Sequence, residues 1–276
     1  MTARQDICTE LKRLGALDDD AFDPAEAGLL LAKLERLRTP LESYRRHLAR
    51  LAEEVGIYAG AEPDLELRAE ALTQVIARRY GYAPTDREEP EAEAINLMEA
   101  IDQRQGSSAA LAMVYLHVVR ALGWPAIALD FPARVYLRLE DGGRRLIIDP
   151  YDAGRIARPE DMRALLKAES GAAAELNFAH HRPLTGRALL LRLHTKVKVR
   201  MLRAERLEEA VAAVEAMLLL APDATTLWRE AGLLHARLDH VKSAVSALEE
   251  YMRRTGAEQT RYSTSVLLQQ LRGRLS

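Results

Sequence analysis

The sequence predicts an α+β protein that is mostly helical and carries one small antiparallel sheet. Ala, Leu, Arg and Glu are abundant and aromatic residues make up only 5% of the 276 residues, a composition that favours helix. A strongly apolar helix is followed by three strand-like runs, and the last third of the chain repeats with a period of 34 residues. These features divide the chain into an N-terminal helical region (1–94), a core (95–186) and a repeat region (187–276).

The N-terminal region has apolar residues at helical spacing. We expect helices over 24–40, where Pro40 interrupts the pattern, over 41–56, and over 65–81. Gly56 and Gly81 are expected to end the second and third of these helices. The stretch 83–94 is acidic, contains proline and has no period, so it is expected to be a loop.

The core begins with a short helix from Ile95 that should end at Gly106. Ser107 or Ser108 can then cap the next helix, because a hydroxyl accepts from the free amides of a first turn. That helix, SAALAMVYLHVVRALG, is apolar on nearly every face and should therefore be deeply buried. Three short strands follow, with the turn DGG between the last two. The strands are expected over 126–131, 135–139 and 145–149. One buried helix on a small antiparallel sheet is an α+β unit.

The C-terminal region repeats itself. Ala210 and Ala244 are 34 residues apart, as are Pro222 and Gly256, and this is the period of the tetratricopeptide helix pair. The second copy carries the pattern in Trp228, Gly232, Ala244 and Leu248. The first copy keeps Ala210, Val214 and Pro222 but has Lys198 in the glycine position. Two copies and the tail helix STSVLLQQLRGRL predict a short helical array.

Composition narrows the functional classes. The net charge is −2, from 39 basic and 41 acidic residues, which gives no general attraction to nucleic acid or to an anionic membrane. The single cysteine, Cys8, cannot form an internal disulfide, and no Cys/His cluster has zinc spacing. Neither a signal peptide nor a membrane span is indicated. We expect a cytoplasmic protein without cofactor or metal.

The core contains the outline of a nucleophilic site. A hydroxyl nucleophile needs a base within hydrogen-bond reach, and the base needs an orienting acid. In chain order the candidates are Ser107 or Ser108, Arg134 and Asp149. A guanidinium stays protonated and has no acceptor lone pair, so Arg134 cannot be the base. His117 lies on the same helix as Ser108, about 13 Å away, and His180 and His181 lie in a loop-rich segment. A structural reading is therefore favoured, in which Ser108 caps a helix and Arg134 pairs with Asp149 or Asp130.

The segment NLMEAIDQRQGSSAALAMVYLHVVRALGWPAIALDFPARVYLRL…LIIDPYDAG resembles the transglutaminase-like superfamily, whose core is papain-like. It is most similar to a bacterial subfamily, named after a regulator of invasion genes, in which tetratricopeptide repeats follow that core. The likeness covers roughly residues 20–276. It puts the superfamily's catalytic cysteine on or next to Ser108, its histidine on Arg134 and its aspartate on Asp149. Only the acid is kept, so the resemblance implies the fold and argues against the usual transglutaminase, protease or deamidase activity.

The repeats imply a protein partner. In tetratricopeptide pairs the first helix of each repeat lines the concave face, and by that resemblance the partner-binding positions fall in two groups. They are Arg192, Thr195, Val199 and Leu202 in the first copy, and Thr226, Arg229, Leu233 and Ala236 in the second. Segment 187–206 is rich in Lys and Arg, so an acidic partner peptide would suit it. A merely solvated helix face explains these charges equally well.

The expected function is therefore that of a non-catalytic scaffold or regulator. One alternative is a residual hydrolase or acyl-transferase that uses Ser108. Another is a peptide or carboxylate ligand bound in the degenerate cleft, where Arg134 could form a bidentate pair. Nucleic-acid binding through the basic helix is disfavoured by the near-zero net charge and the lack of an aromatic stacking platform.

Overall fold

The computed structural model describes residues 3–85, 95–132, 134–256 and 258–275. It divides the chain into two compact units. The first comprises Asp18–Leu193. The second comprises Met1–Leu17 together with His194–Ser276. The division falls at 194, a few residues after the boundary drawn from the sequence, because the helix α8 (Gly186–Arg203) runs through both units. Most of the expected acidic loop, residues 86–94, lies outside the described residues.

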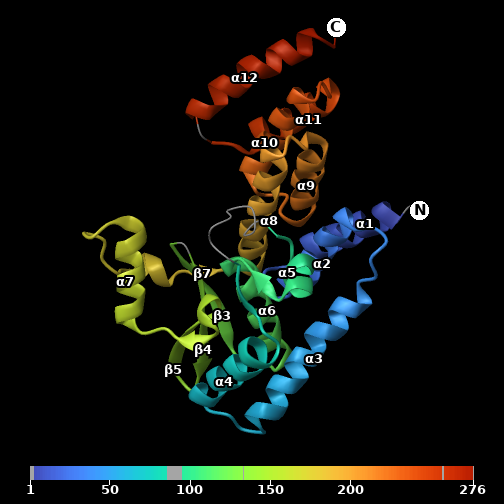
Figure 1. The fold of residues 1–276 in the computed structure, drawn as a ribbon. Helices are drawn as coiled ribbons and strands as arrows, with labels where there is room; N and C mark the ends of the chain where they lie inside the picture. Colours follow the sequence, from blue (N-terminus) through green and yellow to red (C-terminus); the bar gives the residue numbers. More distant parts are fainter. Residues whose placement is uncertain (1–2, 86–94, 133, 257, 276) are drawn as a thin grey trace. The chain divides into compact units, whose positions relative to one another are not determined.

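The first unit begins with helices that the sequence predicted well (Figure 1). Asp23, Asp64 and Asn96 cap helices by accepting from backbone N–H groups of the first turn. The segment predicted as one helix over 65–81 begins as α-helix and continues in π-helical geometry. The elements are α2 (Pro24–Glu35), α3 (Glu42–Ala59), α4 (Leu65–Leu72), the π-helix η1 (Thr73–Arg79) and α5 (Leu97–Gln103).

Three of the predicted helix ends were wrong. The helix α2 ends at Glu35, before the interruption expected at Pro40. The helix α3 runs past Gly56 and ends at Ala59, before Gly60 at φ +77°. A Cβ on Gly56 would lie 2.9 Å from Leu122 Cδ2, so this glycine permits close helix packing instead of a stop. The helix α5 ends at Gln103, before Arg104 at φ +57°, and Gly106 belongs to the short strand β2 (Gln105–Gly106), which pairs in parallel with β1 (Ala83–Pro84).

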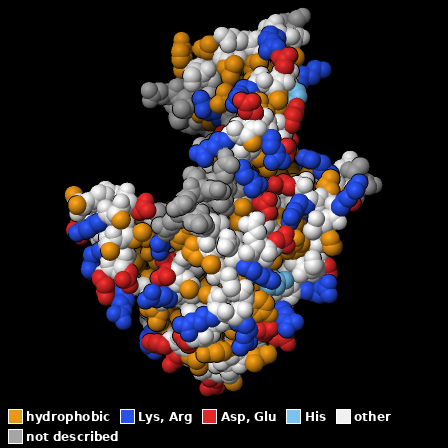
Figure 2. Space-filling view, in the orientation of Figure 1, with side chains coloured by type: hydrophobic (Ala, Val, Ile, Leu, Met, Phe, Trp, Pro, Cys, Tyr) orange, Lys and Arg blue, Asp and Glu red, His pale blue; other side chains and the backbone are white. Residues whose placement is uncertain are grey.

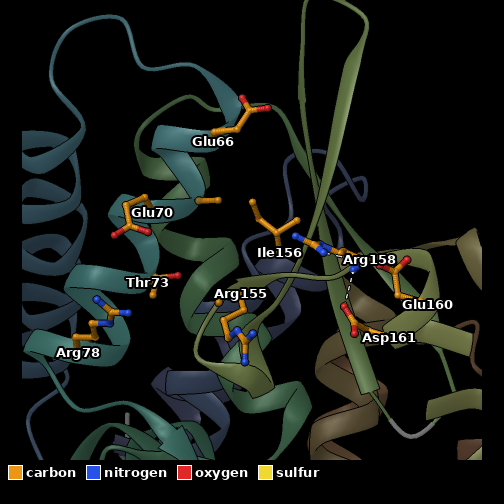
Figure 3. A pocket seen from close by; sticks show the side chains of 11 residues that line it. Glu66, Glu70, Thr73, Arg78, Arg155, Ile156, Arg158, Glu160 and Asp161 are labelled. Atoms are coloured by element: carbon orange, nitrogen blue, oxygen red, sulfur yellow. Dashed lines mark hydrogen bonds and ion pairs between the residues drawn. The ribbon is translucent and has the colours of Figure 1, made fainter. Parts of the chain in front are cut away.

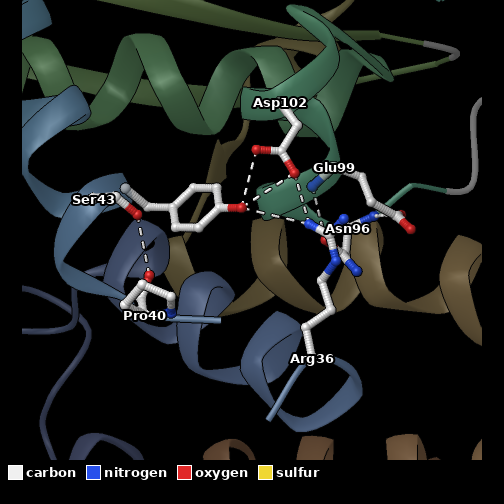
Figure 4. A network of polar contacts seen from close by, with 7 residues as sticks. Arg36, Pro40, Ser43, Asn96, Glu99 and Asp102 are labelled. Atoms are coloured by element: carbon white, nitrogen blue, oxygen red, sulfur yellow. Dashed lines mark hydrogen bonds and ion pairs between the residues drawn. The ribbon is translucent and has the colours of Figure 1, made fainter. Parts of the chain in front are cut away.

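A polar network joins the helices of this unit (Figure 4). The Arg36 guanidinium donates to Asp102 Oδ2 at 2.7 Å, and the Tyr44 hydroxyl donates to Asp102 Oδ1 at 3.0 Å. These three side chains come from the end of α2, from α3 and from α5. The carboxylate therefore gathers three elements at one point, although its side chain is 43% exposed and the ion pair is partly screened by solvent.

The core consists of a buried helix and a sheet, as predicted. Ser107 caps α6 (Ser108–Ala121), which lies against β3 and β4 on one side and α3 on the other. The sheet has the strand order β6-β5-β4-β3-β7, and its neighbouring strands are antiparallel. Gly142 and Gly143, both at positive φ, make the predicted hairpin turn. The elements are β3 (Ala126–Phe131), β4 (Arg134–Asp141), β5 (Arg144–Asp149), β6 (Arg155–Ile156) and β7 (Pro183–Leu184).

The opposite face of the sheet is covered by a further helix. The helix α7 (Pro159–Ser170) contributes Met162 and Leu166 to a cluster with Leu129, Phe131 and Tyr136 of the sheet. Because side chains alternate along a strand, Tyr136 faces α7 whereas Val135 and Leu137 face the other way, toward α6. This alternation decides on which side of the sheet each candidate site residue lies.

The second unit is the predicted helical array, joined by α1 (Ala3–Gly15), which packs on α9. Residues 34 positions apart are buried alike, for example Ala210 and Ala244, both 0% exposed. Gly232 allows α10 and α11 to approach, since a Cβ there would lie 2.5 Å from the Leu248 side chain. Lys198 takes the same position in the first copy and, although buried, forms an ion pair with Glu230. The further helices are α9 (Leu207–Leu220), α10 (Thr225–Arg237), α11 (Val241–Arg254) and α12 (Glu258–Gly273).

Candidate functional site

Ser108 is held at the first turn of α6, next to the sheet. Its Oγ accepts a hydrogen bond from the backbone N–H of Val135 at 2.7 Å, and the residue is 8% exposed. Ser107, not Ser108, is the helix cap, and accepts from the N–H of Ala110. The position that the resemblance assigns to a nucleophile therefore binds the backbone of the strand that carries Arg134.

Arg134 and Asp149 form a partly buried ion pair. Arg134 Nη1 lies 2.5 Å from Asp149 Oδ2, with the two side chains 19% and 6% exposed. The other oxygen, Oδ1, accepts from the backbone N–H of Tyr151 at 2.9 Å, and the guanidinium lies over the Tyr151 ring at 5.3 Å from its centroid. Burial raises the pKa of the Asp149 carboxyl, and the Arg134 guanidinium opposes that rise. The pairing expected from the sequence is thus present.

The three positions of the resemblance do not form a connected chain of contacts. In the described part of the molecule, neither a hydrogen bond nor an ion pair joins Ser108 to Arg134 or Asp149. Strand alternation explains the separation. Arg134 shares a sheet face with Tyr136, toward α7, whereas Val135 lies on the α6 side. Ala133, which the resemblance aligns beside Arg134, lies outside the described residues.

A cavity of about 420 Å³ opens beside the ion pair. Arg134, Asp149 and the Tyr136 phenol line it with three further charged residues, Asp152, Arg155 and Asp161. Ala164, Leu165 and Ala168 of α7 contribute an apolar wall. Burial raises the pKa of the Tyr136 hydroxyl, which stays protonated and can donate a hydrogen bond. Tyr136 was not singled out in the sequence. Tyr136 stands in the predicted strand two residues after Arg134, and this spacing alone predicts that both side chains lie on the same face of the sheet.

The histidines considered as bases lie elsewhere. His117 Nδ1 is 3.8 Å from Asp23 Oδ2 near the far end of α6. His180 Nδ1 accepts from the backbone N–H of Asn177 at 3.0 Å and its ring contacts Phe131. No contact given by the structure for these side chains, or for His181, reaches Ser108. Among the described residues, Ser108 therefore has no base within hydrogen-bond reach.

A second cavity, of about 530 Å³, lies between the α4–η1 segment and the β6–α7 segment (Figure 3). Its side chains carry both signs of charge, so it favours neither a simple anion nor a simple cation. Gly154 in its wall sits at φ +76°, and a Cβ there would lie 2.7 Å from Tyr115 Cε1. The charged lining residues are Glu66, Glu70, Arg78, Arg155, Arg158, Glu160 and Asp161.

The predicted partner-binding residues have different surroundings. Arg192 belongs to the first unit, where its guanidinium pairs with Asp130 Oδ1 at 2.7 Å and donates to the carbonyl of Phe131. In the second unit, Thr195 and Val199 of α8 are exposed, and Arg229 and Leu233 of α10 are partly buried. Arg229 Nε is buried without a hydrogen-bond partner. The structure thus gives Arg192 an intramolecular partner, whereas Arg229 Nε has none among the described residues.

Two wider properties of the molecule bear on function. Over the residues that the structure describes, no helix is long and apolar enough to span a membrane, and no three His, Cys, Asp or Glu side chains are placed to share a metal ion. Figure 2 shows basic and acidic side chains interspersed over the visible face, in keeping with the net charge of −2.

Comparisons with known proteins match both units of this architecture. The model of the transglutaminase-like superfamily matches residues 42–195, and that of the tetratricopeptide repeat matches residues 197–269. A "UPF0162 protein" of Xylella fastidiosa (strain Temecula1 / ATCC 700964) is 25% identical over 254 residues, covering 87% of this chain and 86% of its own. "Protein SirB1" of Salmonella typhimurium is 23% identical over 231 residues, covering 82% and 84%.

Among solved structures, menin aligns with 95% of this chain and 73% of its own at 9% identity, but its TM-score of 0.41 is too low to carry an argument. The family models give a firmer result, because the transglutaminase-like match spans more than half of the chain and the repeat match follows it directly. The chain is similar to the UPF0162 proteins and Protein SirB1, and it belongs to the transglutaminase-like superfamily, with a tetratricopeptide-repeat region after that domain.

Proposed function

We propose that this protein is a non-catalytic member of its superfamily that acts in the cytoplasm as a protein-interaction scaffold or regulator. The domain combination and the relatives fit a regulator or interaction role. The non-catalytic part of the proposal rests on one observation. Arg134, on which the resemblance puts the superfamily's histidine, pairs through its guanidinium with Asp149 at 2.5 Å, and its contacts do not include Ser108.

The chemistry of these residues supports that proposal. A serine hydroxyl is a weak nucleophile unless a base removes its proton, and a guanidinium has no lone pair to accept one. The lone pairs of Ser108 Oγ are also engaged in part by the Val135 N–H. A structural ion pair would therefore stand where the superfamily has a catalytic dyad.

The catalytic question can be tested with the full chain and its Ser108→Ala variant. Assays would follow ammonia release from a glutaminyl peptide, incorporation of a primary amine, and hydrolysis of an activated ester. We expect both proteins to match the buffer rate. Turnover by the unaltered chain that disappears in the variant would support the alternative of a residual hydrolase or acyl-transferase.

The partner is proposed to be a protein segment, acidic in character, that binds the α8 and α10 faces of the second unit. Val199 is 36% exposed, and the partly buried Arg229 has no hydrogen bond or ion pair within the described chain. A partner carboxylate could accept from the Nη groups of Arg229 in a charge-assisted hydrogen bond. Thr195, one turn before Val199 on α8, and Leu233, one turn after Arg229 on α10, would complete the contact.

The interaction can be tested by capturing partners from native cytosol with the full chain and with Val199→Glu and Arg229→Glu variants, read by mass spectrometry. We expect a stoichiometric partner that both variants lose and that is released as ionic strength rises. Ile57→Glu is the matched control, because Ile57 is 75% exposed and lies in the other unit. Equal capture by all four proteins would reject this face as the binding surface.

A second candidate function is suggested by the cavity beside the ion pair. Arg134 and Tyr136 both line this cavity, so the guanidinium and the phenol O–H could donate to a carboxylate or peptide carbonyl. Titration with short peptides and simple carboxylates, followed by the shift of the Tyr136 ring signals in NMR, would test it. Saturable shifts that are absent in Arg134→Met would support a ligand there.

A further inference from the structure

Four titratable side chains contact one another in a row within the second unit. His235 lies on α10, His240 precedes α11, and Glu208 and Glu215 lie on α9. The two Nδ1 atoms of the histidines are 3.5 Å apart. His235 Nε2 is 3.2 Å from Glu215 Oε1, and His240 Nε2 is 3.5 Å from Glu208 Oε1. Each imidazole therefore has a carboxylate on one nitrogen and the other imidazole on the second.

Two neutral imidazoles cannot satisfy these three contacts. Each neutral ring carries one N–H. If both rings direct that N–H to their carboxylates, the two Nδ1 lone pairs face each other across 3.5 Å. If one ring turns its proton inward, its Nε2 lone pair faces a carboxylate oxygen instead. A cation shared by the two Nδ1 atoms would let both rings donate to their carboxylates.

The helical turn alone does not account for the pair of histidines. In the second copy the N–H of His240 donates to the carbonyl of His235, next to Asp239 at φ +61°. The first copy has the same turn, in which the N–H of Arg206 donates to the carbonyl of Met201, next to Glu205 at φ +56°. The backbone geometry is thus common to both repeats, whereas the two imidazoles occur in one.

We propose that His235 and His240 bind a divalent transition-metal ion of the Zn²⁺ class through their Nδ1 atoms. Two nitrogens, each about 2.0–2.1 Å from a tetrahedral ion, are separated by about 3.4 Å, close to the spacing here. Glu208 and Glu215 take the place that carboxylates commonly have behind metal-bound histidines, where they accept the other ring N–H and fix the ring.

The donor set also indicates the class of ion. Imidazole nitrogens suit Zn²⁺, Cu²⁺ and Ni²⁺, whereas Mg²⁺ and Ca²⁺ require oxygen ligands. The protein supplies only two ligands, which agrees with the finding that no group of three is placed to hold an ion within the described chain. Water would complete the coordination, which the 42% exposed side chain of His240 permits. Such an ion would link the two ends of the α10–α11 turn, and the two glutamates of α9 would hold the imidazole rings in place.

The experiment is a titration of the full, metal-free chain with ZnSO₄, followed by isothermal calorimetry and by the Tm, with MgCl₂ as the control salt. The test variant is His235→Met/His240→Arg, which installs the two residues that the first repeat tolerates at the same positions. A Glu208→Gln/Glu215→Gln variant tests the outer carboxylates. His180→Ala/His181→Ala is the control for the other pair of adjacent histidines.

We expect one Zn²⁺ bound per unaltered chain and per His180/His181 variant, with a rise in Tm that MgCl₂ does not produce. The histidine variant should lose both effects, and the glutamine variant should bind about 10–100-fold more weakly. The proposal is overturned if the unaltered chain shows neither heat nor a Tm shift with Zn²⁺. It is equally overturned if the His235→Met/His240→Arg chain binds Zn²⁺ as the unaltered chain does.

Discussion

At the scale of single residues, the pair of Arg134 and Asp149 shows how a buried carboxylate is neutralised inside the fold. Asp149 is 4% exposed and its carboxylate needs either a cation or a proton. Arg134 supplies the cation. The resemblance pointed to both residues, and the residue types alone suggested that they pair. The sequence could not give the direction of the Ser108 hydroxyl, because this direction is set by the backbone N–H of Val135, 27 residues later in the chain.

Removing the positive charge of Arg134 should show how far the buried Asp149 carboxylate depends on it. We expect Arg134→Met to destabilise the fold by about 3–5 kcal/mol at pH 7, because it leaves a buried carboxylate unpaired. The raised pKa of the Asp149 carboxyl should rise further in this variant. The variant should therefore be stable at a pH below the unfolded-state pKa of that carboxyl, and should lose stability as the pH rises through the folded-state pKa. Urea unfolding at pH 7 and pH 4 measures both effects.

A double variant separates pairing from packing. Arg134→Met/Asp149→Asn should recover most of the loss, as a double-mutant cycle would record. Arg155→Met is the control, since the pair of Arg155 with Asp152 is 3.6 Å long and both side chains are mostly exposed. A loss in Arg134→Met that does not change with pH would contradict the account given for Asp149.

Ser108 is expected to matter for stability through the same kind of contact. Ser108→Ala leaves the buried Val135 N–H without its acceptor, which should cost about 1–3 kcal/mol. Ser107→Ala is a close comparison, because it removes the helix cap, a contact of 3.4 Å, and leaves the strand untouched. Denaturation midpoints for the two variants would measure the difference. A loss from Ser108→Ala no larger than a few tenths of a kcal/mol would mean that water replaces the hydroxyl.

At the scale of elements, the structural role of a glycine was the hardest feature to predict from the sequence. Gly81 and Gly123 lie at positive φ beside helix ends, as predicted, but Gly56 lies inside α3. Both roles use the missing Cβ, and only the neighbouring helix, here Leu122, decides between them. Apolar periodicity, by contrast, gave the positions of most helices and of all three main strands, because it reports burial directly.

Gly232 should behave as a packing glycine within the repeat. We expect Gly232→Ala to destabilise the second unit by about 1–3 kcal/mol, because the new methyl group would overlap Leu248. Gly273→Ala on α12 is the matched control, since a Cβ there meets nothing within 4 Å, and it should change stability by less than about 0.5 kcal/mol. Thermal unfolding of both variants distinguishes overlap from helix propensity, which would make both substitutions favourable.

At the scale of the whole molecule, the two units each contain a histidine that folding keeps neutral. Burial lowers the pKa of His194, in the second unit, from 6.5 to about 4. Burial, with the nearby charges of Arg104 and Arg50, lowers the pKa of His47, in the first unit, to about 4. The sequence could not show this, since a histidine in a helix pattern looks the same whether it is buried or not, and the division at 194 emerged only from the fold.

Acid should therefore weaken both units over the same interval. The unfolded chain binds protons on these histidines between pH 6.5 and about 4 that the folded chain does not, so stability is complete above pH 6.5 and falls as pH drops. At pH 5 the loss from His194 is expected to be about 2 kcal/mol. Calorimetric unfolding from pH 7 to pH 4.5 measures it, and His194→Leu removes this titration while His47 stays intact. If the variant loses stability as steeply as the unaltered chain, His194 is not the group responsible, and the acid sensitivity must be assigned to other side chains.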